Sequence, residues 1–267
     1  HRIPMAAYVG VDLGATHVRA LIGDETGQEL TVASADTPRG PTGIDVTEQV
    51  LATIRHACDD VDIDPGDLVA AGNFSTAGGG VADRIARWTG SEWVPVGAGL
   101  PAAANALVEF DGELWAAFTT SPSTPDGAVV RRFDGQDWVD AGDGVADLAL
   151  FPNFFPPVGI AVLDLAVYDG RLHLGGTFAT GATSPGNLAG RWTGTTWERL
   201  AGFGADAGDF AAPWSVECLV PWDGLLVFAG RFPDAGAETI ENIAGWNGDA
   251  FERVADDETG IDGTVFD

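Results

Sequence analysis

The side chains best able to do chemistry are few in this chain and lie far apart in its sequence. The two cysteines, Cys58 and Cys218, have no second cysteine or histidine close by. The four histidines also form no pair: they are His1, His17, His56 and His173. Zinc is held by several such ligands at short spacings, so we expect two buried free thiols and no metal site.

Three short motifs recur in a fixed order after residue 68. One is an aromatic residue, a glycine turn and a second aromatic, in WTGSEW, FDGQDW, WTGTTW and WNGDAF at 88–93, 133–138, 192–197 and 246–251. Another is aromatic-Asp-Gly at 110–112, 168–170 and 222–224, and the third is a small-residue run ending in Phe, such as LGGTF at 174–178. Asp-Gly and Thr-Gly between β-rich runs predict hairpin turns with positive φ. Turn geometry thus explains Asp111, Asp169 and Asp223 without calcium, which needs a cage of several oxygens.

Each cycle of motifs contains four short β-rich runs and recurs every ~45–60 residues, within the range of repeat proteins. Four antiparallel strands with recurring aromatics are typical of a β-propeller blade. The stretch AAGNFSTAGGGVADRIARWTGSEWVPVG (70–97) resembles kelch/WD-like propeller repeats of bacteria and archaea, and this resemblance covers roughly 68–267. We expect a partial propeller of about four four-stranded blades, at about 68–105, 106–163, 164–218 and 219–267.

The blade count leaves the ends of the propeller open. The first repeat lacks its initial strand, and GIDGTVFD at 260–267 stands where another first strand would begin. The ring could close if that segment, or a strand from 6–37, paired with the first blade. Otherwise the open blade edges would favour association between copies of the chain.

Seven of the nine tryptophans fall at repeat positions, which favours packing between blades over a glycan-binding platform. They are Trp88, Trp93, Trp138, Trp192, Trp197, Trp222 and Trp246. Trp115 and Trp214 depart from the pattern, so we expect these two on an exposed, ligand-binding surface.

The residues before the repeats predict a different architecture. Residues 8–12, 18–23 and 29–37 read as strands, and 42–58 as a helix with a capping box at Thr42 and Asp45. A short strand at 68–71 completes the order βββαβ, an α/β half-domain. We expect it to occupy 6–67, after a leader or cloning remnant at 1–5.

The segment VGVDLGATHVRALIGD (9–24) resembles the opening of the ROK sugar kinases, glucokinase-like enzymes with the actin-like ATPase fold, over roughly 6–71. The resemblance implies that this hairpin approaches ATP phosphates. Gly14 would permit close backbone approach, Thr16 would donate a hydroxyl bond and Asp12 would act through magnesium or water. It also implies a catalytic aspartate, a zinc cluster and a second lobe, none of which follows. We therefore expect a truncated, vestigial phosphate turn or an ordinary β-turn, with no enzyme activity and no cofactor.

The composition restricts the partners. The chain has 40 acidic residues and 13 basic ones, all of them Arg, and its net charge is −27. This excess argues against nucleic acid and anionic membranes as partners. The Asp-rich, Lys-free composition resembles that of haloarchaeal proteins, so we expect a salt-adapted protein. Without a membrane span or signal-peptide core, the cytoplasm of a salt-in halophile is the expected location.

Three hypotheses for function remain open. The chain could be a non-catalytic propeller that binds or scaffolds an unknown protein or glycan. It could be the nucleotide- or sugar-binding remnant of a ROK kinase. It could also be a chimera of two gene fragments with no evolved activity, because complete domains usually meet in linkers.

Overall fold

The computed structural model describes residues 7–24, 29–38, 43–63, 68–119, 130–142, 161–178, 187–200, 214–236 and 240–254. The chain divides into two compact units, one of residues 1–70 with 86–94 and the other of residues 71–85 with 95–267. Their described secondary structure is mainly β, as expected. The expected leader at 1–5 and the segment 260–267 lie outside the described residues.

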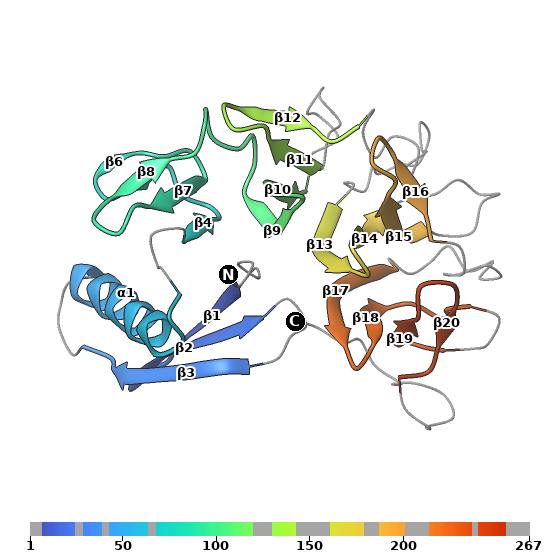
Figure 1. The fold of residues 1–267 in the computed structure, drawn as a ribbon, viewed down its shortest axis with the longest axis horizontal. Helices are drawn as coiled ribbons and strands as arrows, with labels where there is room; N and C mark the ends of the chain where they lie inside the picture. The colour runs from blue at the N-terminus through green and yellow to red at the C-terminus, as the bar shows by residue number, and fades with distance from the viewer. Residues whose placement is uncertain are drawn as a thin grey trace. The chain divides into compact units, whose positions relative to one another are not determined.

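The first unit contains a three-stranded antiparallel sheet and a helix (Figure 1). The elements are β1 (Ala7–Leu13), β2 (His17–Asp24), β3 (Glu29–Asp36) and α1 (Gly43–Asp60). Alternate residues Val18, Ala20 and Ile22 of β2 are fully buried, and the last two form a core with Ile54 and Ala57 of α1. The opposite face of β2 stays exposed, so the sheet is amphipathic in the way its period of two predicts.

The last strand of the expected βββαβ order does not join this sheet. β4 (Val69–Ala71) pairs instead in a sheet with β7 (Ile85–Trp88) and β8 (Trp93–Pro95). Backbone bonds from Trp88 to the Leu68 carbonyl (2.8 Å) and from Gly72 to the Arg84 carbonyl (3.0 Å) continue that pairing at either end of β4. A two-stranded hairpin, β5 (Thr76–Ala77) and β6 (Gly80–Val81), precedes β7.

Three four-stranded sheets follow, named here full blades I, II and III (Figure 1). Blade I contains β9 (Ala104–Phe110), β10 (Glu113–Phe118), β11 (Val130–Phe133) and β12 (Trp138–Asp140). Blade II contains β13 (Ala161–Tyr168), β14 (Arg171–Phe178), β15 (Asn187–Trp192) and β16 (Trp197–Arg199). Blade III contains β17 (Ser215–Trp222), β18 (Leu225–Arg231), β19 (Ile243–Trp246) and β20 (Phe251–Glu252). Each strand pairs antiparallel with the next, and the first strands of successive blades contact each other, which confirms the β-propeller arrangement.

The Asp-Gly dipeptides form the turns that the sequence predicts. Asp111, Asp169 and Asp223 have φ of 54°, 49° and 48°, and the glycine after each also has positive φ. Two successive positive φ angles are typical of the type I′ turn, which matches the twist of the two strands it joins. These aspartates therefore join the first and second strand of each full blade.

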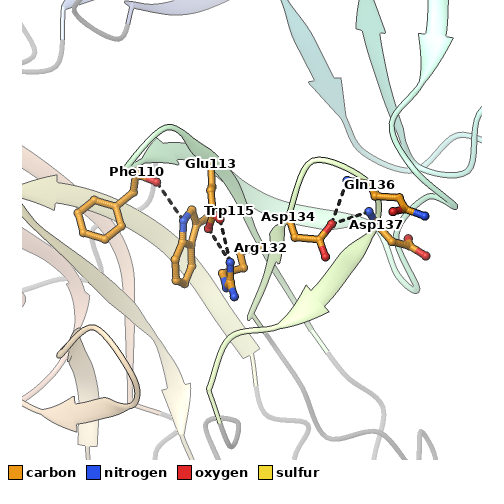
Figure 2. A network of polar contacts seen from close by, with 7 residues as sticks. All are labelled: Phe110, Glu113, Trp115, Arg132, Asp134, Gln136 and Asp137. Atoms are coloured by element: carbon orange, nitrogen blue, oxygen red, sulfur yellow. Dashed lines mark hydrogen bonds and ion pairs between the residues drawn. The ribbon is translucent and has the colours of Figure 1, made fainter.

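The glycine turns between third and fourth strands share one hydrogen-bonding scheme. The backbone N–H of Thr89, Asp134, Thr193 or Asn247 donates to the carbonyl three residues later, at 2.9–3.2 Å. The side chain of the same residue accepts a backbone N–H within the turn, as Asp134 does from Gln136 and Asp137 (Figure 2). These two bonds, that from Asp137 first, lower the pKa of Asp134. The motif thus tolerates Thr, Asp or Asn because each offers a short oxygen acceptor.

Every full blade has a β-bulge at the same place in its first strand, a feature that the sequence motifs did not predict. The register skips Asn105, Leu163 and Glu217 in β9, β13 and β17. The Asn105 amide donates to the Val162 carbonyl of blade II (2.8 Å). Asp164, directly after the second bulge, accepts the Leu219 N–H of blade III (2.6 Å). Polar side chains at or directly after the first two bulges thus bridge one blade to the next.

Apolar clusters fill the spaces between successive full blades. One joins Val108 and Trp115 of blade I to Leu172 and Trp197 of blade II. The other joins blade II to Leu226 and Phe228 of blade III. The core of the second unit therefore lies between the sheets, and each blade is stabilised by its neighbours.

A substitution at Gly175 of β14 would test this close packing. A Cβ added there would lie 2.5 Å from both Leu219 Cδ1 and Val216 Cγ1 of blade III. Gly175→Ala should lower the free energy of unfolding by about 1–3 kcal/mol, measured by chemical denaturation. Gly10→Ala in β1, where nothing lies within 4 Å, is the matched control, and an equal loss in both variants would contradict tight packing at Gly175.

Candidate functional site

The residue that ends the first strand of each full blade is aromatic: Phe110, Tyr168 or Trp222. Phe110 packs against the cluster between blades I and II. Tyr168 packs against the cluster between blades II and III, and its hydroxyl donates to the Gly224 carbonyl (2.6 Å). Trp222 holds the same position in blade III but is 55% exposed.

The residue two positions earlier shows the same contrast. Val108 of blade I and Ala166 of blade II are buried in the clusters between blades, whereas Val220 of blade III is 40% exposed. Residues two apart on a strand lie on one face of the sheet. Val220 and Trp222 therefore share the face of blade III that corresponds to the packed faces of blades I and II.

Cross-strand pairing extends this face onto β18. Cys218 lies opposite Ala229, Val220 opposite Val227, and Trp222 opposite Leu225. We name these six residues the Trp222 face. Its inner members Val227 and Ala229 are nearly buried, so Trp222 and Val220 supply most of the exposed apolar surface.

The corresponding faces of blades I and II carry charge. In blade I, Glu113 lies opposite Phe110 and Arg132 opposite Trp115, and these two charges pair at 2.8 Å (Figure 2). Blade II places Arg171 opposite Tyr168 and Arg191 opposite His173. Blade III instead has Leu225 and Gly245 at these two positions. Leu225 packs over Gly245, since a Cβ there would lie 2.7 Å from Leu225 Cδ1.

The three residues expected at a phosphate turn lie together in the hairpin between β1 and β2. The Gly14 N–H donates to the His17 carbonyl (2.9 Å), and the Thr37 hydroxyl donates to the Gly14 carbonyl (2.8 Å). Thr16 Oγ1 lies 2.9 Å from His17 Nδ1. Asp12 is exposed and pairs in register with Arg19. These bonds tie the turn to the strand end at Thr37, and a role in phosphate binding stays a prediction.

The exposure expected for Trp115 is wrong. Trp115 is 3% exposed, its indole N–H donates to the Phe110 carbonyl (3.2 Å), and its ring lies 5.2 Å from that of Trp192. It occupies the strand position of His173 in blade II, which also faces the neighbouring blade. Trp214 is half-buried against the cluster between blades II and III.

Packing between or within blades holds for most tryptophans at repeat positions. Trp88, Trp138, Trp197 and Trp246 are buried, and Trp93 and Trp192 are half-buried. Trp222 is the exception, and no local motif distinguishes it from the others. The signal that could have drawn attention to it is its order in the chain, since Trp222 belongs to the last aromatic-Asp-Gly copy.

Neither a metal centre nor a membrane helix is found in the part of the chain that the structure describes. Its residues include no group of three or more His, Cys, Asp or Glu that could hold an ion. Its helix is too polar to cross a membrane.

His173 is the titratable side chain most affected by the blade packing. It is almost fully buried, and its Nδ1 lies 3.1 Å from the Arg171 carbonyl. Burial lowers the pKa of His173 to about 4, and the Arg191 and Arg171 charges act in the same direction. The bond to the Arg171 carbonyl and the Asp169 charge oppose this shift, and the Tyr168 ring packs beside the imidazole.

Stability should therefore fall as the pH drops from about 6.5 through about 4, because the unfolded chain binds a proton that the folded chain rejects. Replacing His173 with Val, the residue at this position of blade III, should remove up to about 3 kcal/mol of that loss. Urea unfolding of both proteins between these pH values measures the difference. His56→Gln controls for the loss of an exposed imidazole, and parallel profiles for wild type and His173→Val would contradict the prediction.

No protein-family model matches the chain, and no curated protein matches its sequence. The function of the Trp222 face is therefore inferred from its residues and their geometry.

Proposed function

We propose that the chain is a non-catalytic β-propeller protein that binds or scaffolds a partner. The observation that carries this proposal is the exposure of Trp222 and Val220 at positions that are buried in the other full blades. Aromatic side chains with a large apolar body and a polar N–H are enriched where proteins bind one another. The Trp222 face is thus the surface that the proposal assigns to binding.

The polar side chains of the blades support a non-catalytic role. Asp134 closes a turn, Asp164 bridges two blades, and Glu113 pairs with Arg132. Each is engaged by partners that hold the fold together. Catalytic groups would instead need to be free to meet a substrate at a matched pKa.

The excess of acidic residues supports the proposal that the protein is adapted to high salt. The net charge of −27 makes the compact state repel itself at low ionic strength. Among the described residues, ion pairs such as Arg131–Asp140 (2.9 Å) join strands of one blade and neutralise few of the 40 acidic groups. Molar salt shortens the Debye length to about 3 Å and would remove most of that repulsion.

We also infer that the chain joins two gene fragments. The resemblance to ROK kinases extends to about residue 71, and β4 at that place belongs to a blade-type sheet. The division between the two compact units falls within the same strand, between Ala70 and Ala71. Independent domains usually meet in an exposed linker instead.

Binding through the Trp222 face can be tested by capture of a partner. Immobilised protein in molar KCl should retain a protein or glycan partner from a lysate or glycan array. Trp222→Ala should weaken retention at least ~10-fold, because exposed aromatic anchors commonly supply more than 1 kcal/mol of binding energy. Val81→Ala is the matched control, since Val81 is 73% exposed on the β5–β6 hairpin. Retention that is equal in both variants would assign binding to another surface.

Salt adaptation predicts a higher melting temperature at high ionic strength. The midpoint of thermal unfolding should rise between about 0.1 M and about 3 M KCl, because screening removes repulsion among carboxylates. Calorimetry at matched pH measures the shift. Identical midpoints at both salt concentrations would contradict the proposal.

A further inference from the structure

The turn between β19 and β20 contains the one Asn-Gly pair of the sequence, Asn247-Gly248. The amide carbon of an asparagine side chain can be attacked by the backbone nitrogen of the next residue, and a glycine there puts no side chain in the way. Gly248 has a φ of 103°, and a Cβ built on it would meet nothing within 4 Å. Asn247 itself is exposed, so water can reach the turn.

Blade I shows that this kind of turn accepts a carboxylate at the same position. Asp134 corresponds to Asn247, and one of its carboxylate oxygens accepts two backbone N–H groups of the turn, at 2.8 and 2.9 Å. The Oδ1 atom of Asn247 accepts the two corresponding N–H groups, at 3.0 Å each. An aspartate at position 247 can therefore keep the backbone bonds of the turn.

The amide nitrogen of Asn247 has a partner for which blade I has no counterpart. Its Nδ2 donates to Glu252 Oε2 (2.9 Å), and the residue that corresponds to Glu252 in blade I is Val139. Blade II has Glu198 at this position, where it pairs with Arg191 on the neighbouring strand. The residue opposite Glu252 is instead a glycine. An aspartate at position 247 would remove a donor from Glu252 and place a second carboxylate beside it.

We propose that Asn247 is a site of spontaneous deamidation, and that the carboxylate it forms loosens β20 from blade III. The Gly248 nitrogen bonds to Asn247 Cγ, the Cγ–Nδ2 bond breaks, and ammonia leaves with the former Gly248 proton. Water then opens the cyclic imide at either carbonyl carbon, which gives aspartate or isoaspartate and needs no other reactant. β20 is shorter than β12 and β16, so few bonds oppose its release. This inference does not depend on the binding role of the Trp222 face.

Peptide mapping by mass spectrometry of the full chain, stored in about 3 M KCl, tests the modification. Asn247 should gain the mass of an exchange of amide for acid, whereas Asn73 should stay unchanged over the same time. Asn73 is also exposed, but it precedes Phe74, whose side chain hinders attack on the amide. An Asn247 that stays unmodified in the folded chain while it is converted in urea would overturn the proposal.

Variants at position 247 measure the effect on blade III. Asn247→Asp reproduces the product, and Asn247→Thr supplies the residue of the blade II turn, Thr193, without a charge. The midpoint of thermal unfolding should be lower for Asn247→Asp than for Asn247→Thr at about 0.1 M KCl, and the gap should shrink at about 3 M. Adding Glu252→Gln to Asn247→Asp removes the like charge and should recover most of the loss. Equal midpoints for the two single variants at both salt concentrations, or no recovery with Glu252→Gln, would overturn the loosening of β20.

Discussion

The structure of the second unit depends on one requirement, that each four-stranded sheet bury an apolar face against the next. A blade alone has too little apolar surface on either side to stay folded. The clusters around Trp115 and Phe228 supply that burial between blades I and II and between II and III. Gly175 has no side chain because Val216 and Leu219 occupy the space where one would lie.

Polar side chains also join each blade to the next. The bulge in each first strand frees one residue from regular pairing. Asn105 is that residue in blade I and Asp164 follows it in blade II, and both side chains bind backbone of the next blade. The same packing buries the imidazole of His173 and lowers its pKa to about 4. Bridging bonds and buried clusters thus select one order and spacing of the blades.

Local chemistry made part of this fold predictable. Asp-Gly turns, glycine turns and alternating β1–β3 residues depend on neighbours in sequence, so the motifs located the hairpins correctly. Burial of Trp115 and exposure of Trp222 depend on which sheet stands beside each strand. The two tryptophans were consequently expected the wrong way round, and the bulges at Asn105, Leu163 and Glu217 left no signature that a turn motif could carry.

The corresponding faces of the three full blades differ in the charged residues they carry, and this difference distinguishes the Trp222 face from the other two. In blade I the face tolerates Glu113 because Arg132 pairs with it, and in blade II two arginines flank Tyr168 and His173. Blade III has Leu225 and Gly245 at those positions, in a chain with 40 acidic residues. An exposed surface in such a chain would be expected to carry carboxylates, whereas a surface that docks against another sheet must avoid unpaired charge. The six residues of the Trp222 face carry no charge, and the nearest carboxylate in register on that side of blade III is Glu252, opposite Gly245.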